Sequence, residues 1–324
     1  MYMSTEEKLK LIKNNVEEII TDKELINIIE KKNNKPKAYV GYEPSGKIHL
    51  GHLMTVNKLL DLQKIGFEII ILLADVHAYL NKKGTIEDIK KIADYNKKCF
   101  IALGLDENKT RFILGSEYQM SKEYIINLMK IARKITLNRS IRSMDEVGRQ
   151  MENPMVSQII YPIMQCLDIA YLNVDVSIGG IDQRKIHMLA REHLEDLGFK
   201  KPICIHIPIV LGLDGKKMSS SNSNYISVDD SKEDIYKKIK KSYCEEGNII
   251  NNPILELFKY YICPRYQSII IERSEKYGSN ITYQNYIDLE LSFRNKMIHP
   301  IDLKNAANKY LNEILEPVRN ILKV

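Results

Sequence analysis

Residues 37–52 of the chain read Lys-Ala-Tyr-Val-Gly-Tyr-Glu-Pro-Ser-Gly-Lys-Ile-His-Leu-Gly-His. The apolar run at 37–41 predicts a short strand, and the turn residues at 43–46 predict where it ends. A helix is predicted from about Leu50 to Gly66. A strand, a turn and a helix in this order form the repeating unit of α/β folds, so the segment predicts a parallel sheet.

The same alternation continues beyond this segment. The other predicted strands are 67–74, 111–114, 174–178 and 203–210, and the predicted helices are 86–103, 121–137, 154–171 and a segment that ends near 197. The predicted fold class is α/β, with a Rossmann-like, doubly wound parallel sheet. Such sheets bind ligands at the carboxyl ends of their strands, where the turns 43–46, 75–77 and 179–182 are expected to converge.

The two ends of the chain differ from this central pattern. Ser4 with Glu7, and Thr21 with Glu24, have the capping-box spacing of two N-terminal helices. Apolar residues at helical spacing extend the first of these predicted helices; they are Leu9, Ile12, Val16 and Ile19. After about residue 229 the sequence is mostly helical and rich in Lys and Arg. We therefore predict a Rossmann-like domain at 1–228, with a connective helical insertion, and an all-helical domain at 229–324.

Composition limits the class of protein without deciding it. The 324 residues include 48 Lys and Arg against 42 Asp and Glu, a net charge of +6. This mild excess fits a protein that meets a polyanion, but an AT-rich genome would also favour Lys, Ile and Asn. The five cysteines are odd in number and form no Cys-x-x-Cys pair, so a zinc site or disulfide framework is not expected. No apolar run has the length of a membrane span, so we expect a cytoplasmic protein without a membrane partner.

The histidine motif at the end of the opening segment suits a phosphate ligand. His49 and His52 are three residues apart, so they lie on one face of the first helical turn. Gly51 between them permits close approach of a ligand to the backbone. A helix N-terminus with two imidazoles favours a polyphosphate. A pair of ordinary helix histidines is the alternative interpretation.

Two further segments contain residue types that suit a nucleotide. Residues 217–221 read Lys-Met-Ser-Ser-Ser, and a lysine followed by hydroxyl groups can hold phosphate oxygens on a mobile loop. Residues 179–183 read Gly-Gly-Ile-Asp-Gln at a predicted strand end, where Asp182 could accept bonds from ribose hydroxyls. A solvated loop, and a tight turn with a helix N-cap, are the respective alternatives.

In this order, the segments resemble the HIGH and KMSKS signatures of the class I aminoacyl-tRNA synthetases. The resemblance is closer still to the tyrosyl-tRNA synthetases in their archaeal and eukaryotic form. It extends from Tyr39 to the Leu-Glu-Pro stretch at 315–317. It includes Tyr-Pro-Ile-Met-Gln at 161–165 and His-Pro-Ile-Asp-Leu-Lys-Asn at 299–305.

The resemblance implies a tyrosine site. Tyr39 and Asp168 would hold the substrate phenol, and a site built for that hydroxyl would leave polar groups unpaired with phenylalanine. The residues that match contacts to the substrate ammonium group are Tyr161, Gln165 and Gln183. Two further candidates for the pocket lining are Leu72 and His77. The alternatives are a helix-surface carboxylate for Asp168 and core packing for Tyr161.

The resemblance also implies an ATP site. Its residues would be His49, Gly51 and His52 for ATP, Gly180 and Asp182 for the ribose, and Lys217 and Ser220 for the phosphates. Ser220 stands where the general signature has a second lysine, which leaves Lys217 as the cation of the loop. The tyrosine carboxylate would attack the α-phosphorus, while His49, His52 and Lys217 stabilise charge on the phosphates. Mg²⁺ would accompany ATP on phosphates and water, so no metal site in the protein is predicted.

A tRNA partner follows from the same resemblance. Asp302 and His299 would read anticodon bases, and Tyr277 would stack on one. A helix N-cap is the alternative role for Asp302. The candidates for acceptor-stem contacts are the basic cluster Arg133, Lys134, Arg139 and Arg142, together with Arg184 after the Gly-Gly motif. A solvated charged face is the alternative for at least half of them. The expected partners are tRNA(Tyr), L-tyrosine, ATP and a second copy of the chain, because the family forms homodimers.

Three other functions compete with this one. A tryptophanyl-tRNA synthetase shares the fold and both signatures, but the pairing of Tyr39 with Asp168 favours tyrosine. Small nucleotidyltransferases with a His-x-Gly-His motif act without tRNA, and they lack the C-terminal helical domain. A non-catalytic RNA-binding paralogue would be expected to have lost signature residues that this chain retains.

Overall fold

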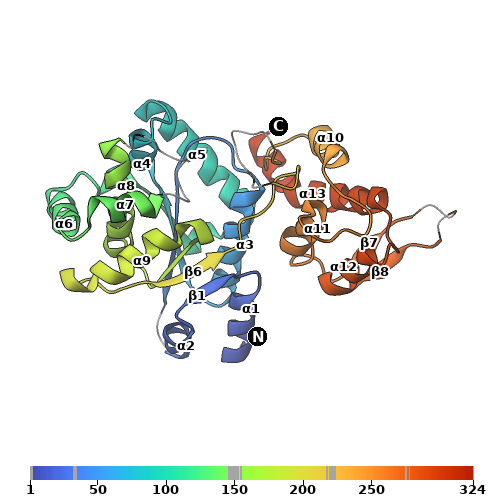
Figure 1. Cartoon of the computed structure of the whole chain (residues 1–324), viewed down its shortest axis with the longest axis horizontal. Helices are drawn as coiled ribbons and strands as arrows, with labels where there is room; N and C mark the ends of the chain where they lie inside the picture. Colours follow the sequence, from blue (N-terminus) through green and yellow to red (C-terminus); the bar gives the residue numbers. More distant parts are fainter. Residues whose placement is uncertain are drawn as a thin grey trace. The chain divides into compact units, whose positions relative to one another are not determined.

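The structure is a computed structural model that describes residues 3–31, 35–144, 153, 155–216, 218, 224–273, 276 and 278–323. The chain divides into two compact units (Figure 1). Unit 1 comprises residues 1–46 and 58–208, and unit 2 comprises residues 47–57 and 209–324. The His49–His52 motif therefore belongs to unit 2, and the strand that precedes it in the sequence belongs to unit 1.

Unit 1 is built on a six-stranded sheet with the order β1-β6-β5-β2-β3-β4. Its strands are β1 (Glu18–Ile20), β2 (Lys37–Tyr42), β3 (Glu68–Leu73), β4 (Thr110–Leu114), β5 (Val176–Gly180) and β6 (Ile203–Ile207). Neighbours from β6 to β4 are parallel, whereas β1 pairs antiparallel with β6 at the edge. The order of strands reverses beside β2, so the predicted doubly wound sheet is confirmed. Its switch point lies at the carboxyl ends of β2 and β5.

Helices connect these strands. They are α1 (Thr5–Lys13), α2 (Asp22–Glu30), α3 (Leu50–Lys64), α4 (Asp75–Leu80), α5 (Ile86–Ala102), α6 (Lys122–Ala132), α7 (Leu137–Met144), α8 (Val156–Tyr171) and α9 (Arg184–His193). All five residues of β6 and residues 69–73 of β3 are buried. Burial of successive strand residues requires cover on both faces of the sheet, as in other parallel sheets.

The N-terminal prediction is partly wrong. Both capping boxes are present, at Ser4 and at Thr21. The first helix, however, ends at Lys13 instead of continuing through Ile19, which lies in β1. Asn15 has a φ of 54°, a left-handed conformation that does not continue a helix. The helix predicted at 121–137 is likewise shorter than predicted, because α6 ends at Ala132 and a separate helix, α7, begins at Leu137.

The core of unit 1 joins the switch point to α8. Buried side chains from β2, β3 and α8 form one cluster, which includes Tyr39, Ile70, Leu72, Tyr161 and Leu167. Helices α6, α7 and α9 all contact α8. The packing therefore fixes α8, and with it the candidate site residues at 161–168, against the carboxyl ends of the central strands.

Unit 2 is mainly helical. Its elements after residue 229 are α10 (Lys232–Lys241), α11 (Pro253–Leu257), a π-helix η5 (Phe258–Ile262), β7 (Ile269–Ile271), β8 (Ile281–Tyr283), α12 (Tyr286–Arg294) and α13 (Pro300–Leu322). The predicted helices are present, but the antiparallel pair β7–β8 was not predicted. Each of its strands has only three residues, too few for a period-two pattern. In the part of the chain that the structure describes, no helix is long and apolar enough to cross a membrane.

Candidate active site

The two histidines of the His-x-Gly-His motif lie at the start of α3 in unit 2. The His49 N–H donates to His52 Nδ1 at 3.2 Å, and the Gly51 N–H donates to His49 Nδ1 at 3.1 Å. The ring centroids are 4.1 Å apart. A neutral imidazole has one donor and one acceptor nitrogen. Because both Nδ1 atoms accept, the proton of each neutral ring is assigned to Nε2.

Burial keeps these histidines neutral. It lowers the pKa of His49 to about 4. Burial, together with the neighbouring His49, also lowers the pKa of His52 well below its usual value. Near pH 7 the motif is therefore uncharged and presents two N–H donors beside the N-terminus of a 15-residue helix. This arrangement suits phosphate oxygens.

Met218, the described residue of the second signature, lies beside the first signature within unit 2. A Cβ on Gly51 would be 2.9 Å from His49 Cε1, so glycine is needed to leave that ring in place. The Met218 sulfur lies 3.6 Å from the same Cβ position. Downstream of the loop, the Ser227 hydroxyl donates to the Ile48 carbonyl at 3.0 Å. The predicted phosphate contacts at 217 and 220 lie outside the described residues.

The carboxylate predicted to bind a phenol is fully buried in unit 1. The Tyr118 and Tyr124 hydroxyls each donate to Asp168 Oδ1 at 2.8 Å. The Gln119 amide donates to Oδ1 at 2.9 Å and to Oδ2 at 3.0 Å. With 0% of its surface exposed, Asp168 is not a helix-surface carboxylate, and that alternative is wrong. Burial raises the pKa of Asp168, while the bonding groups around it act in the opposite direction.

His77, a predicted pocket residue, and Tyr39, a predicted phenol contact, both lie near the Asp168 carboxylate. His77 Nε2 is 3.7 Å from Asp168 Oδ2, and its ring meets the Tyr161 ring edge-on at 4.5 Å between centroids. Both nitrogens of the buried His77 have no hydrogen-bond partner among the described residues. Burial raises the pKa of Tyr39 well above its usual value, and the nearby Asp168 adds to this effect. Unsatisfied buried polar atoms beside a carboxylate indicate a site for a polar ligand.

The predicted ammonium contacts also meet in unit 1. The Gln165 amide donates to Gln183 Oε1 at 3.0 Å. Tyr161 bonds to Glu43 in the turn after β2. At the end of β5, a Cβ on Gly180 would lie 2.3 Å from Asp182 Oδ1, so the carboxylate occupies the space that a side chain would fill. Gln183 is the N-cap residue of α9, although its side chain makes no capping bond, so the proposed N-cap role of Asp182 is wrong.

Comparison with known proteins identifies the family of this chain. Residues 31–316 match the family described as "tRNA synthetases class I (W and Y)". A tyrosine–tRNA ligase of Methanosarcina barkeri is 63% identical over 98% of this chain and 99% of its own length. The chain belongs to the tyrosine–tRNA ligases. The crystal structure of tyrosyl-tRNA synthetase complexed with L-tyrosine from Archaeoglobus fulgidus is 59% identical. It has a TM-score of 0.95 and matches over 98% of this chain and 100% of that chain.

These comparisons also bear on the competing predictions. The tryptophanyl-tRNA synthetase of Aeropyrum pernix is 22% identical, with a TM-score of 0.76 over 93% of this chain and 82% of that chain. That similarity shows a shared fold alone. The small nucleotidyltransferase is excluded, because the match to a tyrosine–tRNA ligase extends through the C-terminal helices.

Three neighbours of Asp168 in this ligase were missed by the sequence analysis: Tyr118, Gln119 and Tyr124. They follow β4, whose apolar run was recognised as a strand. The turn 115–117 lies at its carboxyl end, as 43–46 and 179–182 lie at the ends of β2 and β5. The Asp75 carboxylate accepts from the Ser116 N–H at 2.9 Å and so ties the ends of β3 and β4 together. The position of the turn was therefore the available signal.

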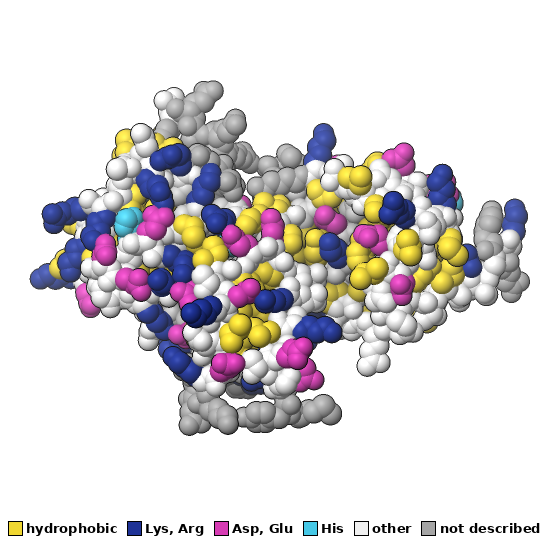
Figure 2. All heavy atoms as spheres, turned by 60° about the horizontal axis from the view of Figure 1, so that its bottom comes forward, with side chains coloured by type: hydrophobic (Ala, Val, Ile, Leu, Met, Phe, Trp, Pro, Cys, Tyr) yellow, Lys and Arg dark blue, Asp and Glu magenta, His cyan; other side chains and the backbone are white. Residues whose placement is uncertain are grey.

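Three of the predicted acceptor-stem residues of the ligase lie together in unit 1. Arg139, Arg142 and Arg184 line one open hollow of about 290 Å³, together with Lys185 and Glu192. Arg139 forms a two-pronged ion pair with Glu192 at 2.5 and 2.6 Å. Figure 2 shows one face of the molecule, over much of which Lys and Arg side chains occur among acidic ones. On that face the basic side chains are spread among acidic ones, whereas the hollow lined by Arg139, Arg142 and Arg184 is a local cluster of cations.

The predicted base readers lie at the N-terminus of α13 in unit 2. The exposed His299 is the N-cap residue, and its side chain accepts from the Ile301 N–H at 3.2 Å. Asp302 lies in the first turn, so the alternative in which Asp302 caps the helix is wrong. The third predicted contact, at position 277, lies outside the described residues.

For a metal, no group of three His, Cys, Asp or Glu residues able to hold an ion occurs among the residues that the structure describes.

Proposed function

We propose that this chain activates L-tyrosine with ATP and transfers the tyrosyl group to the 3′-terminal adenosine of tRNA(Tyr). In the first step the tyrosine carboxylate attacks the α-phosphorus, and tyrosyl-adenylate and pyrophosphate form. In the second step a hydroxyl of the terminal ribose attacks the adenylate carbonyl. The observation that carries the proposal is the buried Asp168 with its three side-chain donors.

Selection of tyrosine follows from how those donors divide between the two carboxylate oxygens. Among the residues that the structure describes, Asp168 Oδ1 accepts bonds from three side chains, whereas Oδ2 accepts one, the 3.0 Å bond from Gln119. Oδ2 therefore retains acceptor capacity for the substrate phenol. Tyr39, 1% exposed and close enough to Asp168 to feel its charge, would supply the second bond. Phenylalanine would bury the carboxylate without that donor, at a cost of several kcal/mol.

The other end of the amino acid needs acceptors for its ammonium group. Tyr161, Gln165 and Gln183 supply polar oxygens near the carboxyl end of β5, and the bond between the two amides orients them. Glu43, bonded to Tyr161, adds negative charge to the same region of unit 1. An orienting contact at each end would hold the substrate in one direction.

Two of the donors in the ATP step, the imidazoles of His49 and His52, carry no charge. His49 and His52 would donate through Nε2 to phosphate oxygens, and Gly51 would allow the phosphates to approach. Gly180 and Asp182 would hold the ribose, and Lys217 and Ser220 the phosphates. We propose that Mg²⁺ enters with ATP, on phosphate and water ligands, where it would neutralise phosphate charge. Catalysis then comes from positioning and charge stabilisation, without a protein nucleophile.

For tRNA, we propose that residues 1–228 form the catalytic domain and residues 229–324 the anticodon-binding domain. Asp302 would accept bonds from a base, with His299 and Tyr277 beside it. The hollow lined by Arg139, Arg142 and Arg184 would receive phosphates of the acceptor stem. Charging of tRNA serves protein synthesis, so we place the protein in the cytoplasm.

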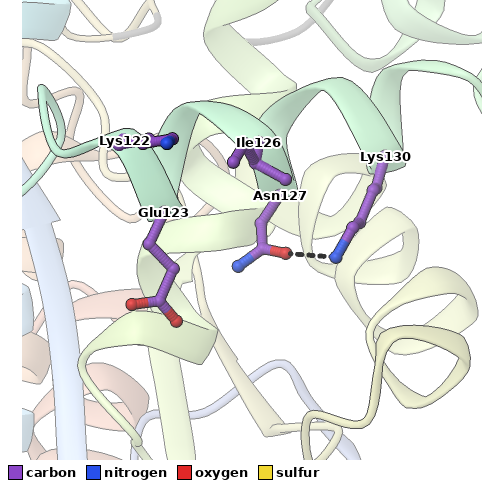
Figure 3. Close-up of a pocket in the computed structure, with 5 residues that line it drawn as sticks. All are labelled: Lys122, Glu123, Ile126, Asn127 and Lys130. Atoms are coloured by element: carbon purple, nitrogen blue, oxygen red, sulfur yellow. Dashed lines mark hydrogen bonds between the residues drawn. The ribbon is translucent and has the colours of Figure 1, made fainter.

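We also propose a homodimer joined through unit 1. Helix α6 has an open hollow of about 330 Å³ along one side, lined by Lys122, Glu123, Ile126, Asn127 and Lys130 (Figure 3). Large apolar side chains are exposed on α6, with Ile126 at 45% and Met129 at 64%, and Met120 just before the helix is 67% exposed. Exposed apolar side chains grouped on one helix are typical of a surface that a partner covers. A second copy is the partner that the family implies.

Amino-acid-dependent ATP–pyrophosphate exchange tests the proposal. We expect exchange with tyrosine and not with tryptophan or phenylalanine, and its loss in Asp168→Ala. Asp196→Asn is the matched control, because Asp196 is an exposed carboxylate paired with Lys134. Exchange with tryptophan would overturn the substrate. Absence of exchange with all three amino acids would favour an RNA-binding paralogue.

A further inference from the structure

A line of polar side chains crosses unit 1 from the inside of the sheet to an arginine of the basic hollow. Ser177 Oγ lies 3.0 Å from His187 Nε2, and His187 Nδ1 lies 3.0 Å from His206 Nε2. His206 Nδ1 lies 2.9 Å from Glu18 Oε2. The Arg184 Nε–H in turn donates to Glu18 Oε2 at 2.8 Å and to Glu18 Oε1 at 3.1 Å. Four elements contribute: β5, α9, β6 and β1.

The chemistry of the groups gives this line one direction. Ionised Glu18 can only accept, so His206 Nδ1 carries a proton. His206 is neutral in its buried place, so its Nε2 accepts and His187 Nδ1 donates. Neutral His187 then accepts through Nε2 from the Ser177 hydroxyl. Every bond therefore points toward Glu18, and each buried polar atom on the line has a partner.

The pKa values agree with these protonation states. Burial lowers the pKa of His187 to about 3. Burial also lowers the pKa of His206, although Glu18 opposes the effect. For Glu18, burial by itself would raise the pKa, but the bonds from Arg184 and His206 outweigh burial and lower it.

Arg184 is bound by Glu18 but remains partly exposed to solvent. Its side chain is 45% exposed and lines the hollow with Arg139 and Arg142. Glu18 grips the Nε end of the guanidinium, and Glu18 is itself fixed by its register opposite His206 in the pair β1–β6. Because a fixed carboxylate binds the planar guanidinium at Nε, the orientation of the guanidinium is fixed. An exposed arginine without such a partner has no fixed orientation.

We propose that Glu18 is a positioning residue for the tRNA step, because it aims Arg184 into the hollow at the end of the line Ser177–His187–His206–Glu18. This inference rests on the proposed function, since it assigns the hollow to the acceptor end of tRNA. Glu18 is not a catalytic residue, and it plays no part in forming tyrosyl-adenylate. It therefore affects the two half-reactions differently.

The test compares aminoacylation of tRNA(Tyr) with tyrosine-dependent ATP–pyrophosphate exchange. In Glu18→Gln we expect kcat/KM for tRNA to fall roughly tenfold, as for loss of a charge-assisted bond, while exchange stays within about twofold of wild type. Glu18→Asp, which keeps the charge, should recover part of the loss. Glu17→Gln is the matched control, because it removes the same charge from the exposed neighbouring residue.

A double-mutant cycle separates positioning from general stability. If Glu18 acts through Arg184, then Glu18→Gln should cost nothing further in an Arg184→Gln background. Arg184→Lys, which keeps the charge but lacks Nε, should lose about as much as Glu18→Gln. It also keeps the test decisive if Glu18→Gln does not fold.

Two results would overturn the inference: wild-type charging by Glu18→Gln, or equal loss of exchange and charging. Failure of the proposed function looks different, because the wild-type protein would then show no tyrosine-dependent exchange.

Discussion

Two carboxylates of this chain are assigned to recognition, and their surroundings differ. Asp168 in unit 1 is fully buried and accepts bonds from side chains of α6 and of the segment after β4. Asp302 in unit 2 lies in the first turn of α13, next to an exposed N-cap histidine. To select tyrosine among similar amino acids, the site needs a fixed hydrogen-bond acceptor that is shielded from water. The reason is that discrimination depends on the free-energy cost of leaving a buried polar group unpaired. A base in an RNA loop can be read at an accessible helix end.

The largest effect should come from the buried carboxylate. In Asp168→Asn the side chain keeps its volume but loses its charge. Its amide nitrogen, itself a donor, would lie against the side-chain donors that now bind the carboxylate. We expect kcat/KM for tyrosine in pyrophosphate exchange to fall roughly a hundredfold or more, which corresponds to about 3 kcal/mol. An exchange rate near that of wild type would show that burial of Asp168 serves packing, and the contrast with Asp302 would disappear.

A second effect concerns buried histidine and the pH dependence of folding. His187 has a pKa of about 3 in the folded chain, and an unfolded histidine has one near 6.5. As pH falls below 6.5 the unfolded state takes up a proton that the folded state does not, so stability decreases with falling pH.

Between pH 7 and pH 5 this one residue should lower the free energy of unfolding by about 2 kcal/mol. Urea unfolding of His187→Gln should therefore depend less on pH by that amount. The same substitution at the exposed His299 is the matched control. Equal pH dependence in wild type and His187→Gln would contradict the expected neutral state of His187.

The smallest effect should come from the exposed carboxylate. Asp302→Asn is expected to raise KM for tRNA roughly tenfold, as for loss of one base contact, and to leave pyrophosphate exchange unchanged. Aminoacylation at varied tRNA concentration measures the first quantity. A fall in exchange would show that Asp302 acts on folding or on the catalytic unit, and it would remove Asp302 as a base reader.

Much of the fold could be predicted because the signals are local. Runs such as 67–74 and 203–210 are mostly apolar, as expected of strands buried on both faces, and the strands β3 and β6 that they contain pair parallel with β4 and β5. The capping boxes at Ser4 and Thr21 were also visible, since each needs only two residues three positions apart. Strand β1 was missed because it has only three residues, and one of them, Ile19, fits the spacing of the helix before it.

The candidate site was less predictable, because its contacts join distant parts of the chain. Gln119 and Asp168 are 49 positions apart, and Glu18 and His206 are 188 positions apart. Nothing in the residues around Glu18 indicates that a buried histidine lies opposite. Periodicity reports which face of an element is buried, but it does not report which element covers that face.

By itself, the sequence determined the α/β class, the positions of the strand ends at the switch point and the family, because apolar runs, turns and short motifs are properties of neighbouring residues. The tertiary structure alone decided which donors surround Asp168 and that Glu18 meets Arg184. Those outcomes depend on hydrogen bonds between elements far apart in the chain. The packing of the whole sheet brings their atoms to within about 3 Å, the distance at which such bonds form.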